Sequence, residues 1–120
     1  MDVPGFEKLK AMSPNASLLH FTTVEGLRVW RDEDGSAIDL EMVSDRRAPN
    51  LVMRLRFTGV VSLKLQDFGD FPTQAPGFDV VDIGDRGWDR LFWEVLDFEE
   101  SRLNFYARTA EILSVERASG

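Results

Sequence analysis

Hydrophobic and polar residues alternate most regularly between Leu51 and Gln66. The apolar residues of this run fall on odd positions: Leu51, Met53, Leu55, Phe57, Val61, Leu63 and Leu65. Most of the even positions are polar, and they include Arg54, Arg56 and Lys64. A period of two buries one face of a β-strand and leaves the other in water. We therefore predict one long strand, or two strands joined by a bend at Gly59, with the odd positions facing the core.

Shorter segments before and after this run also carry strand patterns. We expect strands at 17–23, 27–31, 38–43, 78–83, 91–98 and 103–108. Glu25 and Gly26 predict a turn between the first two, and residues 32–35 predict a hairpin loop in which Gly35 takes a positive φ. Segment 91–98 is apolar on nearly both sides, which indicates a central strand or one that faces a second layer.

The last segment, Ala110–Arg117, fits either a helical turn or an edge strand. Its β-branched residues, with the neighbouring Thr109, favour the strand. Near the N-terminus, Pro4–Met12 has room for one or two helical turns that end at Ser13-Pro14. The segment between Asp67 and Gly77 is rich in proline and glycine and predicts irregular structure.

These patterns predict a mainly β protein, or an α+β protein with one short N-terminal helix. Residues 1–15 would form the helix and a lead-in, and residues 16–117 an antiparallel β domain of about seven strands. A sandwich and a strongly curled sheet both fit. With 120 residues and no shift in composition along the chain, we expect a single domain over 1–120.

The net charge of the chain restricts the classes of macromolecule that it could bind. The chain has 14 basic and 21 acidic residues and a net charge of −7. Nucleic acids are bound by clusters of lysine and arginine, and none is present, so we expect no nucleic-acid partner. A negative field favours encounter with a basic protein. It is equally typical of a domain that is simply well solvated.

The same composition bears on location. Cysteine is absent, which excludes disulfides and thiolate metal sites. The N-terminal residues lack the apolar run of a signal peptide, and no stretch approaches the ~20 apolar residues of a membrane span. We expect a cytoplasmic protein that does not enter the membrane.

Catalytic motifs are missing from the sequence. The single histidine, His20, lies in a strand-like run, and no motif supplies an activated nucleophile beside it. Acidic residues crowd the chain after Pro76, and two carboxylates across a cleft could perform acid–base chemistry. A charged sheet surface is the simpler interpretation. We expect no enzyme activity, no cofactor and no metal.

Aromatic residues in loops are the more informative set. Phe71 and Trp88 lie in glycine-containing segments among acidic residues, as rigid anchors of a binding surface do. The same side chains could instead fold back over the open end of the sheet. The predicted partner-binding residues are Phe71, Asp82, Asp85, Trp88, Asp89, Glu99 and Glu100.

Two segments of the C-terminal half, Leu55–Gln66 and Trp93–Phe105, resemble small acidic bacterial immunity proteins of polymorphic toxin systems and related uncharacterised domains. The matching residues are Phe57, Gly59 and Val60 in a strand, then Asp97, Glu99, Leu103 and Phe105 around an acidic hairpin turn. The resemblance implies a non-enzymatic, β-rich protein that binds and neutralises a cognate toxin.

Together these observations predict a protein-binding module, an immunity-type inhibitor that occludes a basic toxin. The alternative is a small-ligand-binding β domain in which Leu91–Phe98 lines a cavity of roughly 300 Å³ or more. Under either hypothesis an open sheet has edge strands with unpaired backbone groups, so a homodimer through an edge strand also fits.

Overall fold

The computed structural model describes residues 2–33, 35–48, 50–66, 68, 72–84 and 91–118. In these residues eight strands form one antiparallel sheet that does not close into a barrel. One short α-helix precedes the sheet. The predicted mainly β class with an N-terminal helix is confirmed, and the curled sheet is the architecture observed.

Two short helical elements come first in the chain, and the strands follow them. In order, the elements are α1 (Phe6–Met12), the 3-10 turn η1 (Leu18–His20), β1 (Phe21–Asp32), β2 (Gly35–Ser44), β3 (Leu51–Leu65), β4 (Thr73–Gln74), β5 (Phe78–Asp82), β6 (Trp93–Asp97), β7 (Leu103–Ala107) and β8 (Thr109–Arg117). Neither helical element of the described chain is long and apolar enough to span a membrane.

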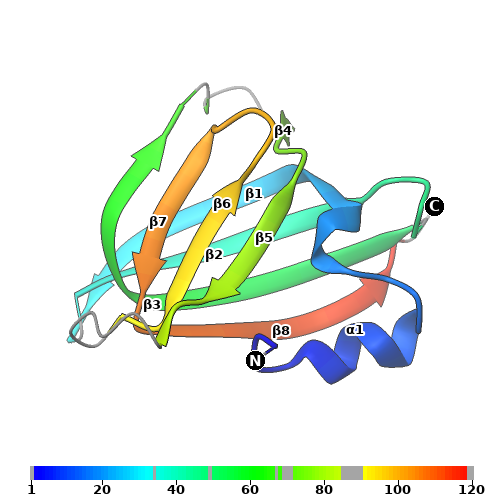
Figure 1. The fold of residues 1–120 in the computed structure, drawn as a ribbon, viewed down its shortest axis with the longest axis horizontal. Helices are drawn as coiled ribbons and strands as arrows, with labels where there is room; N and C mark the ends of the chain where they lie inside the picture. Colours follow the sequence, from blue (N-terminus) through cyan, green and yellow to red (C-terminus); the bar gives the residue numbers. More distant parts are fainter. Residues whose placement is uncertain are drawn as a thin grey trace.

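The sheet bends so strongly that its two halves lie over one another as two layers (Figure 1). The long-strand layer consists of β1, β2, residues 51–58 of β3, and β8, with the short β4 beside β1. The short-strand layer consists of residues 61–65 of β3, β7, β6 and β5. β3 is therefore the strand shared by both layers.

The bend occurs at Gly59, which has a φ of 61°. On the N-terminal side of Gly59, β3 pairs with β8, and on the C-terminal side it pairs with β7. β7 and β8 meet at Arg108, whose N–H donates to the Thr58 carbonyl at 3.0 Å. The predicted bend at Gly59 is confirmed, and it forms the corner between the layers.

The core fills the space between the layers. Phe57 from the long-strand layer meets Phe105 from the short-strand layer edge to face, with ring centroids 5.1 Å apart. The odd positions of β3 from Leu51 to Phe57 are buried as predicted. Val61 and Leu63 are exposed, so that part of the prediction is wrong. Positive φ angles at Gly59 and Ser62 break the alternation beyond the corner.

The region before β2 also differs from expectation. Residues 18–20 form η1, so the strand predicted at 17–23 begins only at Phe21. The turn predicted at Glu25 and Gly26 is wrong, because β1 continues through both residues. Its register with β2 shifts between Val24 and Gly26, so the extra residue is absorbed as a bulge rather than a turn.

Most of the remaining expectations hold. Gly35 closes the β1–β2 hairpin with a φ of 108°. β6 lies between β5 and β7 as a central strand, and Ala110–Arg117 is a strand within β8. Thr73 and Gln74 form a two-residue strand inside the segment predicted to be irregular, since they pair with Thr23 and Val24 of β1.

Candidate functional site

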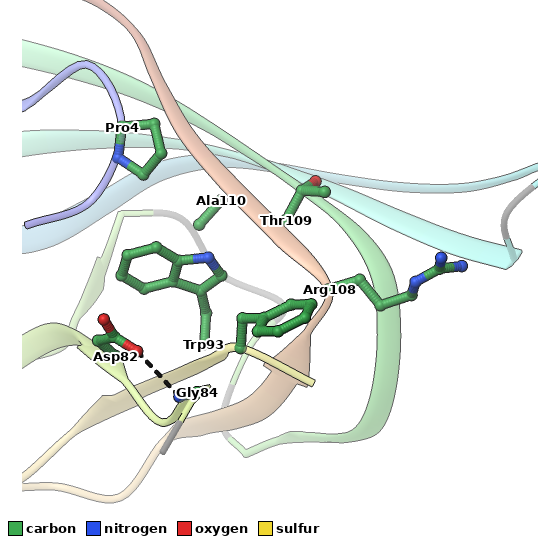
Figure 2. Close-up of a pocket in the computed structure, with 8 residues that line it drawn as sticks. Pro4, Asp82, Gly84, Trp93, Arg108, Thr109 and Ala110 are labelled. Carbon is green, nitrogen blue, oxygen red and sulfur yellow. Dashed lines mark hydrogen bonds between the residues drawn. The ribbon is translucent and has the colours of Figure 1, made fainter. Parts of the chain in front are cut away.

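A pocket of about 690 Å³ opens beside the corner of the sheet. Its described lining comes from the lead-in to α1, the end of β5, the start of β6 and the junction of β7 with β8: Pro4, Asp82, Gly84, Phe92, Trp93, Arg108, Thr109 and Ala110. Figure 2 shows the Trp93 indole between Asp82 and Pro4, with Arg108 pointing away from them. Aromatic and apolar side chains therefore dominate the pocket.

Asp82 is the carboxylate among the described lining residues. Its Oδ1 accepts the Gly84 N–H at 2.9 Å, a bond that shapes the turn at the end of β5 (Figure 2). Of the segment Leu91–Phe98, which was expected to line a cavity, Phe92 and Trp93 do so. Trp93 is nearly buried and forms part of the core, while Phe92 is 48% exposed.

A second candidate surface is the outer face of the short-strand layer. Inward residues of β5, β6 and β7 are buried, and the alternate residues between them are half-exposed. Register places Val81, Glu94, Tyr106 and Val61 in one row across this face. A neighbouring row contains Asp79, Leu96, Asn104 and Lys64. The face is therefore mixed, with apolar side chains beside acidic ones.

Exposed aromatic rings flank both ends of β6. Phe92 precedes the strand, and Phe98, which follows it, is 58% exposed. On this face Val61 is also 45% exposed. Phe98 was not among the binding residues predicted from the sequence. The sequence did contain a signal for its exposure. Phe92, Glu94, Leu96 and Phe98 all fall on even positions and so share one face of the strand, and the charged Glu94 indicates that this face is solvated.

The described residues of the predicted site lie at the two ends of this layer. Asp82 ends β5 and is paired with Trp93 at the start of β6. Glu99 and Glu100 lie in the turn after β6, at the opposite end of that strand, and are exposed. The structure therefore does not bring them together. Asp82 lies at one end of the short-strand layer, and Glu99 and Glu100 lie at the other end. Phe71, Asp85, Trp88 and Asp89 lie outside the described residues.

The turn that carries Glu99 and Glu100 is held firmly. Asp97 is 2% exposed, and its Oδ1 accepts the Leu103 N–H at 2.8 Å across the turn. The Phe98 N–H donates to the Gly77 carbonyl at 3.0 Å. These bonds hold the backbone of the turn that carries Phe98, Glu99 and Glu100.

The outer face of the long-strand layer has a different electrostatic character. Arg56 pairs with Asp39 at 2.9 Å, and Arg54 with Glu41 at 2.8 Å, as expected for cross-strand neighbours. The hydrogen bonds that the Arg56 guanidinium donates to the Asp39 carboxylate raise the pKa of Arg56. Trp30 lies under the guanidinium groups of Arg28 and Arg56, at 4.8 and 5.4 Å from the ring centroid. The charges of Arg54 and Arg56 are therefore matched by acidic partners within the molecule.

Lys64 shares the even positions of the predicted strand with Arg54 and Arg56. The corner at Gly59 separates it from them, since Lys64 faces Asn104 on the short-strand layer. Around that layer, acidic residues outnumber basic ones among the described side chains: Asp79, Asp82, Glu94, Glu99 and Glu100 against Lys64, Arg102 and Arg108. In the part of the chain that the structure describes, no group of three or more metal-ligating side chains is found.

Residues that carry the resemblance to immunity proteins have structural roles as well. Phe57 and Phe105 join the two layers, Gly59 makes the corner, and Asp97 braces the turn that presents Glu99. Comparison of the chain with protein-family models, with curated proteins and with solved structures finds no match.

Proposed function

We propose that the protein is a binding module for a basic protein partner and that the outer face of the short-strand layer is its contact surface. The observation that supports this most directly is the pairing of exposed apolar side chains with acidic ones on a rigid sheet. Phe92 and Phe98 stand at the ends of β6, with Leu96 between them and Glu99 beside Phe98. Aromatic anchors within a polar surround are typical of protein interfaces.

Electrostatics support a basic partner. The net charge of −7 accelerates encounter with a positive surface, and the acidic side chains around the short-strand layer concentrate that field near the apolar anchors. The long-strand layer offers no such excess, because its arginines are paired with Asp39 and Glu41. In its specific form the proposal is an immunity-type inhibitor that occludes a basic toxin.

The direct test is binding to basic proteins encoded by neighbouring genes, measured by calorimetry at low and high salt. Leu96→Lys and Phe98→Ser should each weaken the complex about tenfold or more, as loss of an anchor does. Glu111→Lys, a charge reversal on the long-strand layer, is the control and should change affinity little. A complex that is insensitive to salt and to both short-strand variants would contradict the proposal.

A small-ligand-binding domain is the second candidate, supported by the 690 Å³ pocket beside Trp93. Pockets of this size hold metabolite-sized molecules when apolar walls carry a few polar groups. Intrinsic tryptophan fluorescence titrated with a chemically diverse set of small molecules tests it. Saturable quenching that is lost in Phe92→Ala but kept in Phe98→Ser would favour the ligand-binding function over the protein-binding one.

A further inference from the structure

Among the described residues, the outer edge of β1 from Gly26 to Asp32 has no partner strand. β2 pairs with β1 along its other side, and β4 covers this edge at Thr23 and Val24 alone. An unpaired edge presents backbone donors and acceptors that template pairing with another chain.

Hairpin geometry identifies the groups that point outward. Asp32 and Gly35 face each other at the closed end of the β1–β2 hairpin, where the closing pair is hydrogen-bonded. Antiparallel strands alternate between bonded and non-bonded pairs. Arg28, Trp30 and Asp32 therefore direct their backbone groups to β2, and Leu27, Val29 and Arg31 direct theirs to the open edge. Val29 is also 46% exposed, although its neighbours in the ladder, Ile38 and Phe57, are buried.

The free edge of β8, in contrast, is hydrogen-bonded to the N-terminal segment. The Pro4 carbonyl accepts the Ile112 N–H at 2.8 Å, and Lys8 Nζ donates to the carbonyls of Ile112 and Leu113 at 3.3 and 3.2 Å. The N-terminal segment thus occupies the free side of β8, next to α1 (Figure 1). At the edge of the short-strand layer, η1 packs against β5. The long open edge is the one on β1.

We propose that two copies of the chain form a homodimer by antiparallel pairing of their β1 edges, with Trp30 at the two-fold axis. The proposal is independent of the function proposed above. In this register Arg28 faces Asp32 of the second copy on each side of the axis, so two opposite-charge pairs form. Val29 faces Arg31 of the second copy as a hydrogen-bonded pair, and the two Trp30 residues form a non-bonded pair, whose side chains approach closely.

Charge selects this register over its neighbours. A register centred on Arg28 or on Arg31 brings two arginines face to face, which disfavours pairing. A register centred on Val29 places Arg28 opposite Trp30 of the second copy and leaves no oppositely charged pair among 27–31. The order Arg28, Trp30, Asp32 along one side of the strand is therefore self-complementary about Trp30.

Sedimentation equilibrium on the full chain tests the proposal. The wild type should show a concentration-dependent shift from 13.6 kDa toward twice that mass. Arg28→Asp and Asp32→Arg should each weaken the dimer about tenfold or more, since each places like charges together at two sites. The double variant restores opposite charges and should recover the wild-type association. Glu116→Arg, on β8, is the charge-matched control and should leave it unchanged.

Two further variants keep the test independent of charge. Val29→Pro removes an outward N–H while sparing the bonds to β2, so it should yield a folded monomer by circular dichroism. Because the chain lacks cysteine, Trp30→Cys should form a disulfide-linked dimer on mild oxidation, and Arg31→Cys should not. A monomer at every concentration overturns the proposal. So does a dimer that the double variant fails to restore, or one that cross-links through Arg31→Cys instead.

Discussion

Gly59 and Arg108 face each other at the corner between the two layers. β3 crosses this corner at Gly59, and the chain passes from β7 to β8 at Arg108. Gly59 has a φ of 61°, and a Cβ built on it would lie 2.5 Å from Arg108 Cδ and 2.8 Å from Arg108 Cβ. The corner therefore needs a residue without a side chain for two reasons, its left-handed backbone and the space that Arg108 fills.

Gly59→Ala should accordingly destabilise the fold by about 2–4 kcal/mol, combining the left-handed strain with the overpacking against Arg108. Urea unfolding measures the loss. In an Arg108→Ala background the same substitution should cost less, because the Cγ and Cδ contacts are gone. Equal costs in the two backgrounds would show that Arg108 does not constrain the corner.

Asp97 supports the turn between β6 and β7 by accepting the Leu103 N–H. Asp97→Ala leaves that buried donor without its partner and should cost about 1–3 kcal/mol. Asp97→Asn keeps an acceptor oxygen and should cost less. Chemical denaturation of the pair provides the comparison, with Asp79→Ala on the outer face of the same layer as the control. Identical losses for Ala and Asn would contradict the assigned hydrogen bond.

Asp45 has its pKa lowered from the ordinary value of 3.8, chiefly by hydrogen bonds from the Arg47 guanidinium. Because the folded pKa lies below the unfolded one, the stabilisation is fully present above about pH 4 and is lost as the pH falls through the folded value. The pair is exposed, so screening by solvent keeps its contribution to stability small. Carboxyl NMR titration should show the Asp45 pKa rising in Arg47→Gln. Arg46→Gln, an adjacent exposed arginine, should leave it unchanged.

Phe98 and Phe105 should differ sharply in their contribution to stability. Phe105 is buried against Phe57, so Phe105→Ala should cost about 3–5 kcal/mol. Phe98 is 58% exposed, and Phe98→Ser should change the free energy of unfolding by about 0.5 kcal/mol or less. Thermal and urea unfolding check both values. A large loss for Phe98→Ser would mean that its ring serves the fold rather than a partner.

The sequence alone was sufficient for much of the fold. Period-two alternation in 38–43, 51–57 and 103–107 identified strands and their buried faces, because that signal is local and depends on burial of one side alone. The bend at Gly59 and the hairpin at Gly35 could be predicted because each glycine lies where the backbone must turn, within the alternating run and at the end of the polar loop 32–35. Residues 17–20 and 25–26 were misassigned. A 3-10 turn replaces the start of the first predicted strand, and the bulge between Val24 and Gly26 depends on the register of β1 with β2, which no local pattern encodes.

The candidate site depended much more on tertiary structure. The acidic composition and the abundance of aromatics could be read directly from the chain. Which aromatic faces solvent is decided by the layer that packs over it, and for this reason the sequence did not single out the exposed Phe98. Asp82 and Glu99 were both predicted to bind the partner, and the length of β6 separates them. In the part of the chain that the structure describes, the edge of β1 beyond Val24 is open because β4 pairs with it at Thr23 and Val24 alone. Sequence determines the alternation of each strand, and long-range pairing decides which faces and edges remain exposed.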